Sequence, residues 1–194
     1  MNNTPRRPRR VVMGLCLTLA LLPILASCGQ KTKMLGIVGF NYTDRYIVSF
    51  AVDGAGGGDV DLSDSMDGGG KTSCCIGYNP YTPLPVTMTV KWTFGYERGP
   101  KGNIVVPNET HVATAELNGP VPADPQQLEV HFMPDGTVQL RITREGSRPL
   151  VNVKRSEKLL RVRALQEARW RAWADAAAKR RETAASSPAE TSNP

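Results

Sequence analysis

The residues with the clearest chemistry lie near the N-terminus, where a thiol follows a basic and then an apolar segment. Four arginines lie within positions 6–10, and Thr18 is the only polar side chain in the run 11–26. The run ends in Leu25-Ala26-Ser27-Cys28, the pattern of a bacterial lipobox. Small residues before the cysteine let a signal peptidase reach the backbone, and the thiol can become a diacylglyceryl thioether. We therefore predict a lipoprotein signal peptide over 1–27, with lipidation of the cysteine that follows it.

The alternative interpretation of the apolar run is a transmembrane anchor. Such an anchor needs about 20 apolar residues, whereas the run 11–26 is shorter, contains Pro23 and ends in a cleavage pattern. Gly29, rather than Asp, follows Cys28, which in bacterial lipoproteins as a class favours sorting to the outer membrane. We expect a protein anchored by lipid at the outer membrane and facing the periplasm, with 28–33 as a short tether.

The chain has four cysteines, and two of them are adjacent. Cys16 leaves with the signal peptide and Cys28 carries lipid, which leaves Cys74 and Cys75. In an oxidising compartment thiols usually pair, but adjacent cysteines can close only an unusual eight-membered ring. Two alternatives therefore stand: a disulfide between neighbours, or two buried thiols on opposite faces of a strand. A metal site is disfavoured, because neither a Cys-x-x-Cys motif nor a nearby His completes a ligand set.

An acidic, glycine-rich segment covers residues 53–70. It contains seven glycines and the aspartates Asp53, Asp59, Asp61, Asp64 and Asp67. Asp59-x-Asp61-x-Ser63 copies the start of a helix-loop-helix calcium loop. The pattern then fails, because Asp64 stands where the sharp turn needs Gly, and Gly70 stands where a bidentate Glu belongs. We expect a solvated acidic loop without a metal, in which the glycines serve special backbone conformations and tight strand connections.

Familiar catalytic motifs are absent from the sequence. It has neither a Gly-x-Ser-x-Gly elbow nor a His-Glu-x-x-His helix. Of its two histidines, His111 and His131, the second falls on the polar face of an alternating strand, where we expect a solvated side chain. Paired carboxylates occur only in the glycine-rich loop, where no apolar surroundings would raise a pKa. We predict a binding protein, with neither catalytic residues nor a cofactor.

The elements that must position these residues are mostly strands. Apolar and polar side chains alternate without a miss over 86–96, which is typical of a half-buried strand. The same period covers 128–133 and 138–143, and Pro134-Asp135-Gly136 between them predicts a hairpin. Shorter candidate strands cover 34–40, 46–52, 72–76 and 111–117. We predict a mainly β domain over 34–150, forming a small antiparallel sandwich or a partly closed barrel, followed by a C-terminal α-helix.

The segment 156–183 has no Gly or Pro and is dominated by helix-forming residues, so it predicts the helix. Its apolar side is incomplete, because charged and amide side chains interrupt a stripe made by Leu159, Val162, Trp170, Trp173 and Ala177. The favoured interpretation is a helix packed on the β domain by its two tryptophans. The alternative is a basic helix on anionic lipid head groups, or an arm that grips a partner. We assign 151–183 to this basic helical tail and 184–194 to a disordered tail.

The charge distribution argues against a nucleic-acid partner. The 194 residues carry a formal net charge of +6, and a single basic patch on the fold would favour nucleic acid. However, residues 28–150 carry ten basic and thirteen acidic side chains, whereas 151–194 carry ten basic and five acidic ones. The basic excess therefore belongs to the two ends of the chain, and the predicted β domain is mildly acidic.

A set of ordered motifs resembles a known family. The motifs are Asn41-Tyr42-Thr43-Asp44-Arg45-Tyr46-Ile47, the glycine triplets 56–58 and 68–70, the pair Cys74-Cys75, and Val130-His131-Phe132-Met133-Pro134-Asp135-Gly136. Together they resemble a family of small proteobacterial lipoproteins that bear a domain of unknown function. The resemblance runs from about Gly36 to Thr143, so the helical tail lies outside it.

Members of that family are often encoded beside phospholipase effectors of the type VI secretion system. The resemblance therefore implies an immunity protein that binds such a phospholipase in the periplasm and inhibits it. We expect the partner-binding residues to be Tyr42, Asp44, Arg45 and Tyr46, with charge complementarity from Asp59, Asp61, Asp64 and Asp67. The alternative for 42–46 is a turn and strand start with a local Asp–Arg pair. Two other classes of function remain: a structural envelope lipoprotein that associates with membrane or another envelope component, and a binder of small ligands or metals.

Overall fold

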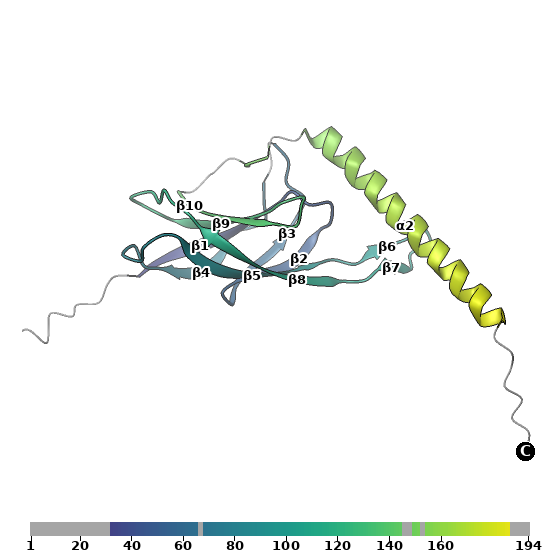
Figure 1. Cartoon of the computed structure of the whole chain (residues 1–194). Coiled ribbons are helices and arrows are strands. Elements are labelled where there is room, and N and C mark those ends of the chain that lie inside the picture. Colours follow the sequence, from purple (N-terminus) through teal and green to yellow (C-terminus); the bar gives the residue numbers. More distant parts are fainter. Residues whose placement is uncertain (1–31, 66–67, 145–148, 152–153, 187–194) are drawn as a thin grey trace, which may run out of the picture. The chain divides into compact units, whose positions relative to one another are not determined.

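The computed structural model describes residues 32–65, 68–144, 149–151 and 154–186. The predicted signal peptide, Cys28 and the last eight residues of the chain lie outside this part. The described elements are shown in Figure 1 and are β1 (Lys33–Asn41), β2 (Ile47–Val52), β3 (Ala55–Val60), β4 (Ser73–Tyr78), β5 (Val86–Phe94), β6 (Glu97–Arg98), β7 (Ile104–Val106), β8 (Glu109–Leu117), β9 (Gln127–Phe132), β10 (Val138–Thr143) and α2 (Arg155–Ser186).

Eight of the strands form one sheet in the order β3-β2-β5-β8-β10-β9-β1-β4. Its two edge strands meet, because Ser73 Oγ on β4 donates a hydrogen bond of 3.0 Å to the carbonyl of Gly57 on β3. The sheet therefore nearly closes into a barrel. Together with helix α2, it confirms the predicted mainly β fold with a C-terminal helix. The pairs β1–β9 and β8–β10 are parallel, so the sheet is mixed. Local alternation cannot show how strands far apart in the sequence pair.

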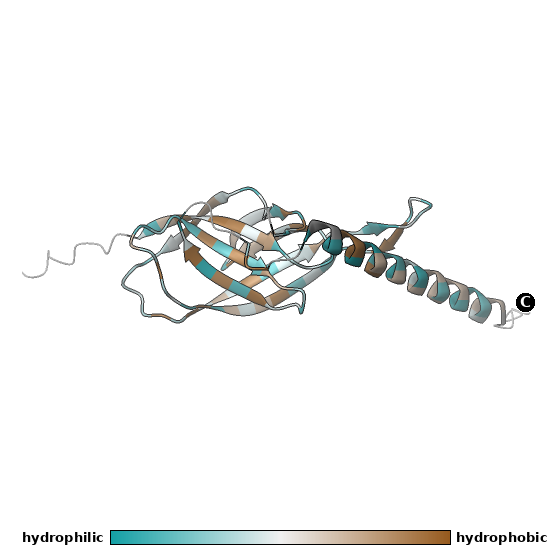
Figure 2. Cartoon of the chain, turned by 90° about the horizontal axis from the view of Figure 1, so that it is seen from above, coloured by the Kyte–Doolittle hydropathy of each residue, from teal (hydrophilic) through white to brown (hydrophobic). Residues whose placement is uncertain are grey.

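The inside of the barrel holds the main hydrophobic core. Apolar and polar bands alternate along the strands (Figure 2), as the sequence predicted for β5. Phe50, Trp92 and Phe132 meet in the interior, with Phe132 at ring-centroid distances of 5.4 Å and 5.5 Å from the other two. A Cβ atom at Gly57 would overlap the Phe50 ring, so this glycine lets β3 pass close to the core.

Strand β9 is buried on both faces, which contradicts the expected solvated position of His131. His131 is 0% exposed and Glu129 is 1% exposed. A second, outer cluster of Val38, Phe40 and Tyr42 covers this face of the sheet together with Val151. Alternation therefore fails to predict burial here, because the chain beyond β10 returns over the outer face of β9.

The polar groups under this outer cover are satisfied by one another. His131 Nε2 lies 3.2 Å from Glu129 Oε2, and His131 Nδ1 lies 3.2 Å from the Tyr42 hydroxyl. Thr143 Oγ1 donates to the other Glu129 oxygen at 2.9 Å. The Tyr42 hydroxyl in turn accepts a hydrogen bond from the Leu150 amide at 2.8 Å. Burial of polar groups is tolerated when each finds such partners.

The predicted hairpin around Pro134-Asp135-Gly136 and the predicted C-terminal helix are both confirmed. Strands β9 and β10 pair antiparallel around Pro134-Asp135-Gly136, and Gly136 has the positive φ of 83° that this turn requires. Helix α2 begins one residue earlier than predicted and ends three residues later, so residues 184–186 of the predicted disordered tail are helical. In the described residues, no helix has both the length and the apolar character needed to cross a bilayer.

Candidate functional site

The first sequence motif builds the turn between β1 and β2. Asn41 is fully buried, and its side-chain nitrogen donates to the Arg45 carbonyl at 2.8 Å. Its side-chain oxygen accepts from the amide and the hydroxyl of Thr43, at 3.0 Å and 2.6 Å. Asparagine favours such positions because its side chain can replace backbone partners in a turn. This part of the motif therefore stabilises the fold.

Two of the predicted partner-binding residues are buried, so the expectation that they form exposed recognition groups is wrong. Arg45 is 8% exposed and donates to Glu109 Oε2 at 2.7 Å and to the carbonyls of Gly95 and Pro107. Tyr42 is 6% exposed, and burial raises the pKa of its hydroxyl. The alternative of a turn and strand start describes this segment better, although Arg45 pairs with glutamates rather than with Asp44.

The predicted acidic residues do not form one exposed surface. Asp59 and Asp61 are exposed, whereas Asp64 is 6% exposed and Asp67 lies outside the described residues. Tyr46, 39% exposed, donates its hydroxyl to Asp59 Oδ2 at 2.8 Å, and this hydrogen bond raises the pKa of Tyr46 to about 12. Tyr46 and Asp59 therefore form a hydrogen-bonded pair at the surface of the barrel.

The second glycine triplet lies flat against β1, as the expected tight connections require. Gly70 donates its amide to the Gly39 carbonyl at 3.0 Å. Gly69 has a φ of +85°, and a Cβ atom there would overlap that same carbonyl. Ser63 Oγ accepts hydrogen bonds from the amides of Asn41 and Gly69. Ser63, the last of the three residues that match the calcium-like pattern, therefore joins the end of β1 to the second glycine triplet.

The adjacent cysteines, whose state the sequence left open, form a disulfide. Cys74 and Cys75 lie on β4, an edge strand of the sheet, and their sulfur atoms are bonded to each other. Within the described part of the chain, no group of three or more His, Cys, Asp or Glu side chains is placed to hold a metal ion.

Helix α2 is attached to the β domain by two cations. Lys158 is 8% exposed and donates its Nζ to the carbonyls of Asn41, at 2.7 Å, and Ser63. Burial lowers the pKa of Lys158 to about 8, although the charge of Asp64 acts in the opposite direction. The Lys158 ammonium therefore reaches the same turn that Asn41 organises.

The second attachment lies about three helical turns further along α2. Arg169 donates to Asp44 Oδ2 at 2.5 Å and to both carboxylate oxygens of Glu97, at 2.5 Å and 3.1 Å. Asp44 of the predicted recognition set thus forms an ion pair with α2, and the Tyr42 ring of the same set lies 5.9 Å from the Lys158 ammonium. The sequence indicated Arg169 only as an interruption of an apolar stripe, because its partners are 72 and 125 residues away.

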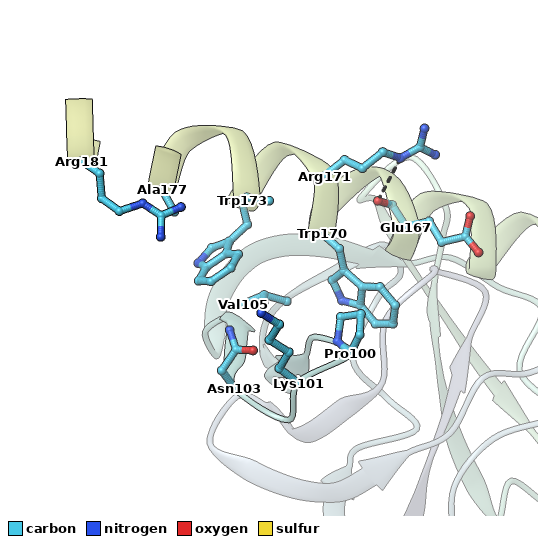
Figure 3. A pocket seen from close by; sticks show the side chains of 11 residues that line it. Pro100, Lys101, Asn103, Val105, Glu167, Trp170, Arg171, Trp173, Ala177 and Arg181 are labelled. Carbon is cyan, nitrogen blue, oxygen red and sulfur yellow. Dashed lines mark hydrogen bonds between the residues drawn. The ribbon is translucent and has the colours of Figure 1, made fainter. Parts of the chain in front are cut away.

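Near the second attachment, an open groove of about 740 Å³ lies between α2 and the β6–β7 hairpin. Figure 3 shows Trp170 and Trp173 pointing from the helix toward Pro100 and Val105 on the hairpin. Trp173 is 38% exposed, so the groove leaves much of its indole accessible. We name this surface the tryptophan groove.

The tryptophan groove has an apolar floor and charged ends. Arg181 lies at the end nearer Trp173, Glu167 lies at the end nearer Trp170, and Lys101 lies on the hairpin below Val105. The Trp170 indole nitrogen is buried and has no hydrogen-bond partner among the described residues. The exposed indole of Trp173 therefore gives the groove its accessible aromatic surface.

Comparison with known proteins gives a family but no function. Neither the curated proteins nor the solved structures contain a match. A family model described as "Protein of unknown function (DUF3304)" matches residues 40–140, just over half of the chain. The match begins at the end of β1 and ends within β10, so it excludes α2. The chain therefore belongs to the DUF3304 family.

Proposed function

We propose that the chain is a lipid-anchored periplasmic binding protein, and that it acts as an immunity protein by inhibiting a phospholipase effector of type VI secretion. The lipobox pattern that ends at Cys28 supports the anchor. The sequence resemblance to lipoproteins encoded beside such effectors supports the partner. Lipid attachment holds the inhibitor at the membrane, where a phospholipase must act on its substrate.

The tryptophan groove is the observation that supports a binding role best. Tryptophan and arginine are the residues most often found at the energetic centre of protein interfaces. Here two tryptophans on one helix line an open groove, and one of them is 38% exposed. The side chains of Tyr42 and Arg45 are hydrogen-bonded within the β domain. We therefore propose that an exposed surface such as this groove binds the partner.

An activity titration tests the proposed inhibition. The purified protein is added to the phospholipase effector encoded nearest to its gene, and hydrolysis of a fluorogenic phospholipid is followed through equimolar protein. We expect a linear loss of activity that is complete near one protein per enzyme, because a tight inhibitor titrates its target. Unchanged activity, with no complex in gel filtration, would contradict the proposal and favour a structural envelope lipoprotein.

The proposed anchor is tested separately in cells fed an alkyne-labelled fatty acid. Wild-type protein is expected to incorporate the label, and the variant Cys28→Ala is expected to lose it. Cys16→Ala is the matched control, because this cysteine lies inside the predicted signal peptide and should leave labelling intact. Labelling that persists in Cys28→Ala would overturn lipidation at this residue.

A further inference from the structure

We propose that the tryptophan groove takes an acidic segment of the phospholipase effector, with a large apolar side chain of that segment seated between Trp170, Trp173 and Val105. This inference rests on the proposed function and specifies its contact surface. It assigns the binding role to α2 and to the β6–β7 hairpin, rather than to the turn at 41–47.

The shape of the groove supports a peptide occupant. Its volume of about 740 Å³ lies within the range of clefts that hold drug-sized ligands, about 300–1,000 Å³. Its walls come from two elements, since Trp170 and Trp173 extend from the helix toward the hairpin residue Val105 (Figure 3). Val105 is 7% exposed and closes the floor. An apolar side chain that enters from outside would bury the exposed part of Trp173.

The charges around the groove support an acidic occupant. Lys101 and Arg181 both line the groove. Over residues 171–186 the helix carries the basic residues Arg171, Lys179, Arg180 and Arg181 but only the acidic residues Asp175 and Glu182. The excess of positive charge attracts acidic partners and speeds their association. The β domain is mildly acidic, so this end of the chain differs in charge from the rest.

The distribution of apolar residues favours a protein over a membrane surface. A helix that lies on a bilayer needs a continuous apolar face. In Figure 2 hydrophilic and hydrophobic residues are mixed along α2. Leu159 and Leu160 are exposed outside the groove, but the groove itself is a concave apolar surface between two elements, which a side chain can enter more readily than a flat lipid surface can.

The test compares two groove variants with two matched controls in the phospholipase titration. Trp173→Ala removes the exposed indole, and Leu160→Ala removes an apolar side chain that is 69% exposed outside the groove. Arg181→Glu reverses a charge in the groove, and Arg180→Glu makes the same change at a neighbour that does not line it. We expect the two groove variants to need at least about tenfold more protein for half-inhibition, and the controls to stay within about twofold.

The outcomes separate this inference from the proposed function. If wild-type protein inhibits the enzyme and both groove variants inhibit equally well, the groove is not the contact surface, although the immunity role stands. If wild-type protein does not inhibit the enzyme, both the proposed function and this inference are wrong. Circular dichroism checks that each variant is folded, and Arg181→Glu decides the matter if Trp173→Ala is not folded.

A membrane role for the groove is a third outcome. Binding of wild-type and variant proteins to phosphatidylglycerol vesicles is measured by co-sedimentation. Loss of vesicle binding in both groove variants, together with unchanged inhibition, would overturn the proposal in favour of a lipid surface. Loss of inhibition with unchanged vesicle binding is the expected result.

Discussion

The two halves of helix α2, 155–170 and 171–186, carry five and four basic residues but have different surroundings. In the first half, Lys158 and Arg169 reach carbonyls and carboxylates of the β domain. In the second half, residues 171–185 are exposed apart from Ala177, which is partly buried. A basic residue therefore serves as an attachment where the fold presents fixed acceptors, and as surface charge where it does not.

This difference explains how a helix without a clean apolar stripe stays on the domain. Most helices in proteins are stabilised by packing of an apolar face. Here the attachment is made by a lysine under the turn at Asn41 and an arginine between Asp44 and Glu97. Partly buried, hydrogen-bonded ion pairs contribute more than exposed ones, because water screens them less. The second half is then left available for binding.

The largest expected effect comes from breaking the first attachment. Lys158→Met removes the donor to the Ser63 carbonyl and to one lone pair of the Asn41 carbonyl. We expect the free energy of unfolding to fall by about 1–3 kcal/mol, measured in urea. Lys179→Met, an exposed lysine in the second half, is the control, with an expected change within about 0.5 kcal/mol. Equal effects would contradict the difference between the halves.

A smaller effect is expected at the second attachment. Arg169→Ala removes three hydrogen bonds to Asp44 and Glu97 and leaves Glu97, 11% exposed, with Arg45 at 3.8 Å. We expect a loss of about 1–2 kcal/mol and faster hydrogen exchange of the amides that follow in α2. Arg171→Ala is the control, because Arg171 is exposed and bonds only to a backbone carbonyl in the described structure. Unchanged exchange in Arg169→Ala would show that this attachment does not hold the second half.

Local patterns in the sequence predicted most elements of the fold. Alternation found β5, the Pro-Asp-Gly signal found the β9–β10 hairpin, and composition found α2. Alternation misplaced His131, because burial of the outer face of β9 depends on Tyr42 and on the chain around Leu150. Contacts between residues so distant in the sequence leave no periodic signal.

The same limit applies to the candidate site. Arg45 has the residue type of an interface anchor, but its acceptors at Gly95 and Glu109 turn it inward. Lys158 and Arg169 lie in the predicted helix, and only the folded β domain shows what they bind. The tryptophans were predicted to pack on the domain. They do contact the hairpin, and the groove between them is a property of the assembled fold.

A pH experiment sharpens the account of the first attachment. The pKa of Lys158 is lowered by burial from its ordinary value of 10.5 to about 8. Between these values the unfolded chain holds a proton that the folded chain has lost, so this residue makes the unfolding free energy rise with pH. The neutral amine keeps two N–H donors for its two carbonyls. We expect wild-type protein to gain stability relative to Lys158→Met between about pH 7 and pH 10, and parallel pH profiles would refute this.

The smallest effect on stability is expected in the second half of the helix. Trp173→Ala removes an indole that is 38% exposed and projects into an open groove, so we expect the unfolding free energy to change by less than about 1 kcal/mol. Trp170→Ala is the comparison, because its indole nitrogen is already buried, and we expect the larger loss there. If Trp173→Ala lowers the free energy of unfolding as much as Lys158→Met does, both halves of the helix are packed equally firmly on the β domain. A small loss combined with weakened inhibition would show that this tryptophan serves binding rather than folding.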